Sequence, residues 1–199
     1  MPLATTAENY ALDQLGTSKM LYASLHTAYS SSGANEVTGG GYARQAATWS
    51  AASGGSKSLA SVLPSFSVPS STTVEFVGFW DASTSGNFQG MFPNGGASPF
   101  AFSATTAASV FTAPGSGYSN GQTVVLFLTA GATLPGGFTA GTVYYVINAS
   151  TDTFKLSATL NGSAVTVTVD GSGIVAGITP ETFGSAGTFA LTSGSVTLT

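Results

Sequence analysis

The chain has 199 residues, of which only 6% are charged, and its formal net charge is −4. It contains no cysteine, which excludes disulfides, thiolate metal ligands and thiol nucleophiles. Four basic residues are too few for the positive surface that nucleic-acid binding requires, and no run of about 18 apolar residues predicts a membrane span. The start of the chain lacks the basic and apolar segments of a signal peptide, so we expect synthesis in a cytoplasm.

The composition favours a mainly β fold. Hydrophobic residues make up 43% of the chain, enough for a core, and 26 glycines and 8 prolines supply turns. Abundant Thr, Val and aromatic residues favour strands. Strand edges are normally protected by charged side chains, which are scarce here. We therefore expect other subunits to cover the edges, as in a homo-oligomer or a larger assembly.

The first part of the chain predicts one helix followed by antiparallel strands. The helix is expected over residues 6–25, with Thr6 as N-cap and Gly16 as a break between two pieces. A strand over residues 42–49 follows the glycine-rich loop 30–41. Another is expected over residues 73–80, with Val74, Phe76, Gly78 and Trp80 on one face, and a tight turn at 81–86 leads to a short returning strand at 88–92.

A second region, residues 110–177, predicts a small barrel or sandwich of its own. Strands are expected over residues 122–130, 142–148, 153–157 and 164–169. Asn161-Gly162 and Asp170-Gly171 are turn dipeptides of the hairpin kind.

The last two β runs, residues 179–183 and 188–198, carry apolar residues that need partners, so we expect them to return to the first sheet. The prediction is thus an antiparallel β-sandwich or barrel-like core with one N-terminal helix, formed by residues 1–104 and 179–199. Residues 105–178 would be a small inserted all-β domain.

Few residues offer chemistry. His26 is the single histidine, and we interpret it as a structural residue, hydrogen-bonded where the helix meets the sheet, because no acid and nucleophile are arranged around it. Glu36 and Arg44 are expected to form an ion pair that closes the loop between them. Plain solvent exposure or a substrate-binding arginine are the alternatives.

The remaining acidic residues give little indication of a catalytic or metal-binding site. Asp81 is interpreted as a turn former, and nothing supports Glu75 and Asp81 as a catalytic carboxylate pair. Asp152, Asp170 and Glu181 lack the dense acidic loop of a calcium site. We expect no enzyme activity, no metal and no cofactor.

Aromatic residues in the second region are candidates for a sugar-binding surface. They are Tyr118, Phe138, Tyr144, Tyr145 and Phe154. Strand alternation places Tyr144 and Tyr145 on opposite faces, so one should be core and one exposed. The candidate surface-binding residues are Tyr118, Phe138 and Tyr145. The alternative interpretation is that these aromatic rings pack in a core or between subunits.

Two groups of segments in the sequence resemble known proteins. Ser24-Leu-His-Thr-Ala28, Gly33-Ala-Asn-Glu-Val37, Gly39-Gly-Gly-Tyr-Ala-Arg44 and, later, Val77-Gly-Phe-Trp-Asp-Ala82 resemble a family of small tailed-bacteriophage virion proteins often described as tail-fibre or minor tail proteins. The motif residues are His26, Asn35, Glu36, Tyr42, Arg44, Trp49 and Trp80. Members of this family often continue almost directly into a segment like Thr179-Pro-Glu-Thr-Phe183, which agrees with an insertion. The segment from Leu134 to Asn148, with Phe154-Lys-Leu-Ser157, is similar to a small β module that recurs in phage structural proteins.

The resemblance implies a non-enzymatic structural protein of a tailed-phage virion, assembled in the host bacterial cytoplasm. It would be displayed on the particle surface as a tail-fibre-like or minor tail protein. Its partners would be capsid or tail subunits and further copies of itself, a trimer being one form, without nucleic acid and without membrane insertion. Two alternatives stay open: a capsid decoration protein that stabilises the shell, and a module that binds host surface glycans.

Overall fold

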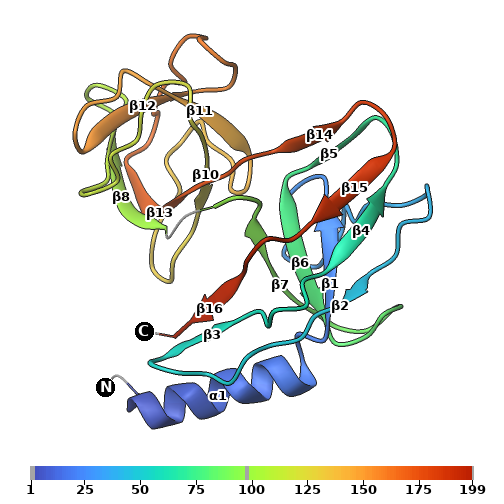
Figure 1. The fold of residues 1–199 in the computed structure, drawn as a ribbon. Helices are drawn as coiled ribbons and strands as arrows, with labels where there is room; N and C mark the ends of the chain where they lie inside the picture. The colour runs from blue at the N-terminus through green and yellow to red at the C-terminus, as the bar shows by residue number, and fades with distance from the viewer. Residues whose placement is uncertain (1–2, 97–98, 199) are drawn as a thin grey trace. The chain divides into compact units, whose positions relative to one another are not determined.

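The computed structural model describes residues 3–96 and 99–198, and within these ranges it has one α-helix and sixteen strands. The mainly β class with one N-terminal helix is confirmed (Figure 1). The chain forms two compact units, Met1–Phe92 with Glu181–Thr199, and Pro93–Pro180. Residues 1, 2, 97, 98 and 199, which the sequence assigned to the core, lie outside the described residues. The helix is too short to cross a membrane, and no other is present in the described part.

Helix α1 spans Thr5–Ser18, shorter than predicted, and its N-cap is Ala4 instead of Thr6. Residues 22–26 form strand β1 (Tyr22–His26) because all five of them pair with a later strand, and this tertiary pairing overrides their local helical pattern. Gly16 does not break the helix. It is buried where the side chains of Lys57 and Trp49 approach the helix backbone.

The first unit contains a four-stranded sheet in the order β2-β1-β6-β7. Beside β1 it comprises β2 (Gln45–Ala46), β6 (Phe76–Trp80) and β7 (Phe88–Pro93). The predicted strand 42–49 is therefore only two residues long, and the predicted strand 73–80 is divided at Glu75. β6 is buried along its whole length, since loops cover the face of the sheet opposite the core.

Three short antiparallel pairs join the tail of the chain to this unit. β14 (Glu181–Phe183) pairs with β5 (Thr72–Val74), β15 (Gly187–Ala190) with β4 (Ser65–Val68), and β16 (Ser195–Thr197) with β3 (Ser56–Ser58). The tail thus returns to the first unit as expected, but to these two-stranded ribbons and not to the four-stranded sheet. Phe66 and Phe189 pair across one ribbon and are both buried, so the tail completes the core.

The second unit is a closed barrel with the strand order β10-β11-β12-β9-β8-β13 (Figure 1). Its strands are β8 (Phe100–Thr105), β9 (Val110–Thr112), β10 (Thr123–Phe127), β11 (Val143–Ile147), β12 (Thr153–Ser157) and β13 (Gly171–Gly177). Closure comes from pairing of β13 with both β10 and β8. Alternate side chains point inward, as in any small barrel, and Phe111, Leu126, Val146 and Phe154 fill the interior.

One predicted strand of this unit is wrong, and one strand was not predicted. The alternating run 164–169 is no strand: Ala164 makes one isolated bridge to Ser157, and Val167 is buried without joining a ladder. The barrel is completed instead by β13, whose three glycines weaken the strand signal. A side chain at Gly173 would collide with the Phe127 carbonyl, so the glycine allows close strand packing.

The barrel begins earlier than residue 105. Residues 100–104, assigned from the sequence to the core, form most of β8 and pair with β13. Where the chain enters and leaves this unit, its two ends run side by side. The Thr179 N–H donates to the Asn94 carbonyl at 2.7 Å, and the Asn94 amide donates to the Thr179 carbonyl at 2.8 Å.

Candidate functional site

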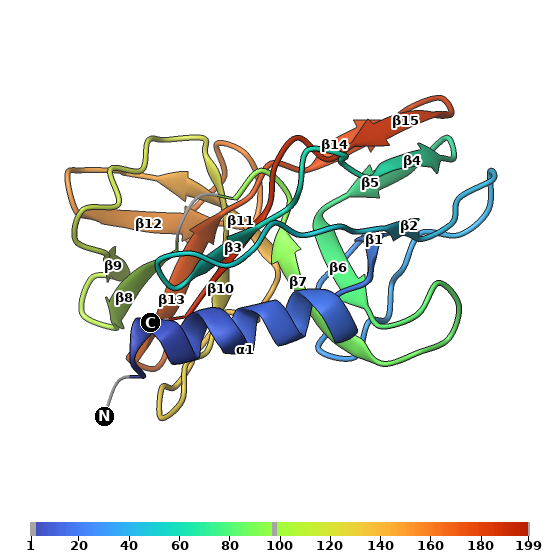
Figure 2. The ribbon, with the colours of Figure 1, turned by 60° about the horizontal axis from the view of Figure 1, so that its bottom comes forward.

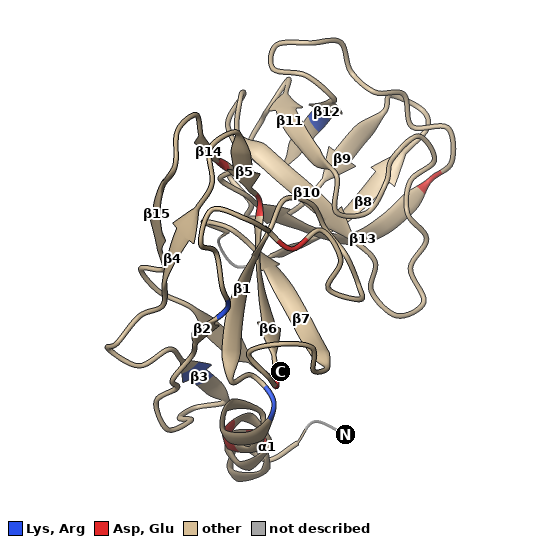
Figure 3. Cartoon of the chain, turned by 90° about the vertical axis from the view of Figure 1, so that its right-hand side faces the viewer, with Lys and Arg blue, Asp and Glu red and all other residues tan. Residues whose placement is uncertain are grey.

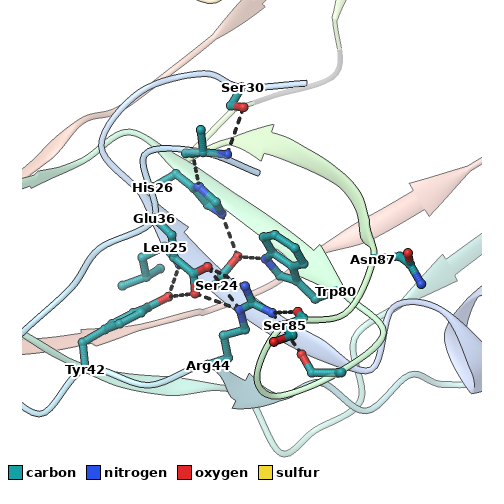
Figure 4. Close-up of polar contacts among 12 residues, drawn as sticks. Ser24, Leu25, His26, Ser30, Glu36, Tyr42, Arg44, Trp80, Ser85 and Asn87 are labelled. Carbon is teal, nitrogen blue, oxygen red and sulfur yellow. Dashed lines mark hydrogen bonds and ion pairs between the residues drawn. The ribbon is translucent and has the colours of Figure 1, made fainter. Parts of the chain in front are cut away.

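A cluster of polar contacts, here called the buried polar cluster, comprises Ser24, His26, Glu36, Tyr42, Arg44 and Trp80 (Figure 4). Ser24, His26 and Trp80 are buried, whereas Glu36, Tyr42 and Arg44 are half-buried. Ser24 and His26 are two residues apart on β1 and therefore point to the same side. Both are fully buried. The cluster joins five of the seven motif residues predicted from the sequence, and it is the only concentration of charged and polar groups that the motif produces among the described residues.

The hydrogen bonds of His26 define its protonation. Its Nδ1 lies 2.9 Å from the Ala34 carbonyl, which can only accept, so Nδ1 carries the proton. Its Nε2 therefore accepts from the Ser24 hydroxyl at 2.8 Å, and the Trp80 indole N–H donates to the same hydroxyl at 2.9 Å. Burial lowers the pKa of His26, which agrees with a neutral ring.

The Ser24–His26 pair has the distance of a nucleophile and a base, but its surroundings serve structure. A catalytic histidine needs a carboxylate on its second nitrogen and a serine that substrate can reach. Here the second nitrogen faces a backbone carbonyl, and Ser24 is fully buried. The expected location is corrected: His26 ends β1 beneath the 27–37 loop, whereas α1 ends at Ser18, away from it.

Glu36 and Arg44 form the predicted ion pair. The Arg44 Nη2 lies 2.7 Å from Glu36 Oε2, and Nε donates to both carboxylate oxygens. Nη1 donates to the carbonyls of Ala82 and Ser85, at 3.2 and 2.6 Å. The guanidinium also stacks on Trp80, 3.5 Å from the ring centre. Each of the three guanidinium nitrogens donates at least one hydrogen bond, so Arg44 clamps the 81–87 turn to the 36–44 segment.

Tyr42 links the ion pair to β1. Its hydroxyl accepts from the Leu25 N–H at 2.8 Å and donates to Glu36 Oε1 at 3.1 Å. Burial raises the pKa of Tyr42 well above its usual value, so the phenol stays a donor. Its ring stacks on Phe66 of the core.

The other two motif residues lie outside the cluster. Asn35 has a positive φ of 62° and is exposed, with its carbonyl accepting from the Thr27 N–H, so it shapes the turn. Trp49 is half-buried against Phe79 and donates to the Met20 carbonyl at 2.7 Å. It fastens the chain that follows α1.

Two glycines that sequence reasoning did not assign to the site are required by it. A Cβ on Gly78 would collide with His26 Nε2 and with Oγ of Ser24, its register partner on β1. Gly33 has φ of 82° and lies against the rings of Trp80 and Phe88. The two-residue spacing of Ser24 and His26 could have predicted that their side chains share one face of a strand. The contact of both with Gly78 could not have been predicted, because it depends on the register between β1 and β6.

The acids accept hydrogen bonds that hold loops, within one turn for Asp81 and between distant segments for Asp152 and Asp170. Asp81 accepts from the backbone and side chain of Asn87, and these bonds lower its pKa. Asp152 and Asp170 accept from the N–H groups of Gly115 and Thr106. Within residues 3–96 and 99–198 no group of three His, Cys, Asp or Glu side chains could hold a metal ion.

The structure agrees only in part with the prediction of surface aromatic residues on the barrel. Phe138 is buried and packs on Phe111 and Tyr144, so it is not a surface residue. Tyr118 is half-buried, with its ring against Phe100 and Phe154. Tyr144 is buried and Tyr145 half-exposed, as alternation required.

An open hollow of about 280 Å³ lies beside the cluster, lined by uncharged residues of the 29–31 segment and of β7. Phe88 separates it from His26 and Trp80, whose rings it contacts edge-on. Pockets that bury a ligand are enclosed and measure roughly 300–1,000 Å³, so the hollow by itself indicates no ligand.

Residues 3–94 match the protein family described as podophage GP4 fiber I protein gp80. The matched range contains every residue of the buried polar cluster and ends at the last strand before the barrel. No curated protein and no solved structure matches the chain. The family match supports a structural protein of a tailed-phage virion.

Proposed function

We propose that the chain is a tail-fibre-like or minor tail protein displayed on the surface of a tailed-phage particle. The observation that carries this proposal is the match of residues 3–94 to a phage fibre family. The chemistry of the buried polar cluster agrees, because its hydrogen-bonding groups face one another and hold loops in place.

The two units would have different roles in the virion. The first unit carries the family match and would attach to other virion proteins, capsid or tail subunits. The barrel lies outside the match, has a core of its own, and would be presented outward. An insertion of this kind is tolerated where the two chain ends are adjacent, as they are at Asn94 and Thr179.

Location and copy number on purified virions test the proposal. Quantitative mass spectrometry should find few copies per particle relative to the major capsid protein. Gold-labelled antibodies against the barrel should mark the tail region of intact particles in electron microscopy. Antibodies against a capsid protein and against an internal virion protein serve as the accessible and inaccessible controls.

A copy number that matches the capsomers, with label spread over the head, would overturn the tail assignment and identify a decoration protein. Label that appears only after particles are broken would overturn surface display.

A further inference from the structure

Helix α1 and the last strand of the chain are held by the same segment. α1 packs on β3, and β3 pairs with β16, so the three elements lie side by side (Figure 2). β3 is one arm of a hairpin, residues 50–58, whose ends meet where the Ser50 N–H donates to the Ser58 carbonyl at 2.9 Å. The 50–58 hairpin is therefore the principal neighbour of both the helix and the tail strand.

One residue of this hairpin binds both of them. The Gly55 N–H donates to Asn9 Oδ1 of α1 at 2.9 Å, and the Gly55 carbonyl accepts from the Leu198 N–H, just after β16, at 2.9 Å. A Cβ on Gly55 would lie 2.9 Å from Glu8 Oε2 and 3.3 Å from the Leu198 carbonyl oxygen. Helix and tail thus meet at a single glycine.

Lys57 makes a second link between the helix and the tail. Its side chain is buried, and its ammonium donates to Asp13 Oδ1 at 2.5 Å and to the Ser50 carbonyl at 2.6 Å. In Figure 3 the blue segment of β3 lies near the red segments of α1. The stem of Lys57 lies against Gly16 of the helix, and Val196 of β16 is its register partner.

These contacts are mainly polar. In residues 5–18, 50–58 and 195–197 the one apolar side chain that is fully buried is Leu12, while Leu15 and Val196 are half-buried against the core. Strand β6 of the four-stranded sheet, in contrast, is buried along its whole length. Segments with few buried apolar contacts open at a lower free energy than core strands, so these three should open before the sheet does.

We propose that α1, the 50–58 hairpin and β16 form a latch that opens as one unit while the four-stranded sheet stays folded. When α1 leaves, Lys57 loses its carboxylate partner in a buried position, and a buried charge without its partner is strongly destabilising. β3 is then displaced, and β16 is released because its pairing partner has moved. The latch makes the first helix and the last strand interdependent, although they lie at opposite ends of the sequence.

Hydrogen–deuterium exchange of the full chain, followed by mass spectrometry, tests the proposal. After correction for intrinsic exchange rates, residues 5–18, 50–58 and 195–198 of the wild type should report one common opening free energy. Their exchange should be faster than that of β1 and β6, which remain paired when the latch is open.

Asp13→Ala tests the coupling from the helix side. It removes the acceptor of Lys57 and of the Ala52 N–H, so exchange should become roughly tenfold faster in all three segments, residues 195–198 included. Alanine favours a helix more than aspartate does, so a loss of helix preference cannot cause the change. Gln14→Ala is the matched control, because Gln14 is the next residue and is exposed; its exchange should equal that of the wild type.

Val196→Pro tests the coupling from the tail. Proline removes the N–H of a strand residue and should weaken the pairing of β16 with β3. Exchange in residues 5–18 should then become faster by a similar factor. Exchange in β1, β6 and the β4–β15 pair should not change, which establishes that the first unit is folded.

The proposal is overturned if the three segments of the wild type open with different free energies, or no more easily than β1 and β6. It is also overturned if Asp13→Ala accelerates the helix and the hairpin but not residues 195–198, if Asp13→Ala and Gln14→Ala behave alike, or if Val196→Pro leaves α1 unchanged. None of these outcomes depends on where the protein lies in a virion.

Discussion

Ser24, His26 and Gly78 form a close cross-strand contact within the four-stranded sheet. Ser24 and His26 share a face of β1, and Gly78 lies directly across on β6, where Ser24 is its register partner. The pair needs a space without a side chain opposite, which explains why a glycine stands in a fully buried strand despite its low strand preference.

Gly78→Ala should lower the free energy of unfolding of the first unit by about 2–3 kcal/mol, because the new methyl group displaces the Ser24 and His26 side chains and breaks their hydrogen bond. Urea unfolding followed by tryptophan fluorescence measures this unit alone, since both tryptophans, Trp49 and Trp80, lie in it.

Gly184→Ala is the matched control for this substitution. No atom would lie within 4 Å of a Cβ at Gly184, so the free energy of unfolding of this variant should stay close to that of the wild type. Equal effects of the two substitutions would show that the cross-strand contact with Gly78 contributes nothing.

His26 should make stability depend on pH near neutrality. Its pKa is lowered by burial from an ordinary value of 6.5, so the unfolded chain binds more protons than the folded one just below pH 6.5. The free energy of unfolding should therefore fall as the pH decreases from 6.5 toward the folded pKa. Unfolding curves at half-unit pH steps from 7.5 to 4.5 follow the change.

His26→Gln should abolish this slope, since His26 is the single histidine of the chain. The carboxyls of Asp13, Asp81 and Asp170 have lowered pKa values and lose their contributions only below about pH 3.8. Burial raises the pKa of Glu75, which gives a dependence of the opposite sign. A wild type and a His26→Gln variant with parallel pH profiles would contradict the assigned neutral histidine.

At the scale of elements, Arg44 joins segments that the backbone leaves apart. One guanidinium contacts Glu36 in one loop, two carbonyls of the 81–87 turn, and the Trp80 ring of β6. Because the charge is satisfied by a bidentate carboxylate and by stacking, a lysine at this position cannot reproduce the contacts.

Arg44→Lys should destabilise the first unit by about 1–3 kcal/mol and release the 81–87 turn. Hydrogen–deuterium exchange should be faster in residues 81–87 and 36–44. Gln45→Ala is the control, because the Gln45 side-chain amide donates to the carbonyl of Ala43, two residues away in the same segment. Unchanged exchange in the turn would exclude the clamp.

At the scale of the molecule, the barrel should be separable. Residues 93–180 enclose their own core, and β14, β15 and β16 pair only with strands of the first unit. A chain in which residue 92 is joined to residue 181 through a short glycine linker should fold, with tryptophan fluorescence close to that of the full chain. The isolated barrel, residues 93–180, should unfold cooperatively.

A joined first unit that stays unfolded would show that the barrel is needed to bring the tail strands back. Retention of the Gly78→Ala destabilisation in the joined chain would show that the buried polar cluster is intact without the barrel.

Sequence patterns predicted several strands and one ion pair correctly, because the pattern of a strand follows from the alternation of side chains along its own backbone. Two-residue alternation identified β11 and β12, and charge identified the Glu36–Arg44 pair. The helix was predicted too long, because the helical pattern of residues 22–25 is overridden by pairing with β6. β13 was missed because glycine, rare in strands, is accepted there for close packing.

By itself, the sequence determined the β class, the helix near the start, the resemblance to phage virion proteins and the return of the tail. These follow from composition, periodicity and motif, which require only neighbouring residues. The tertiary structure decided that Ser24, His26 and Trp80 form one hydrogen-bonded chain, that Phe138 is core, and that Asp13 of α1 pairs with Lys57 of β3. Those facts depend on strand register and on which face a loop covers, and such contacts join residues far apart in the chain.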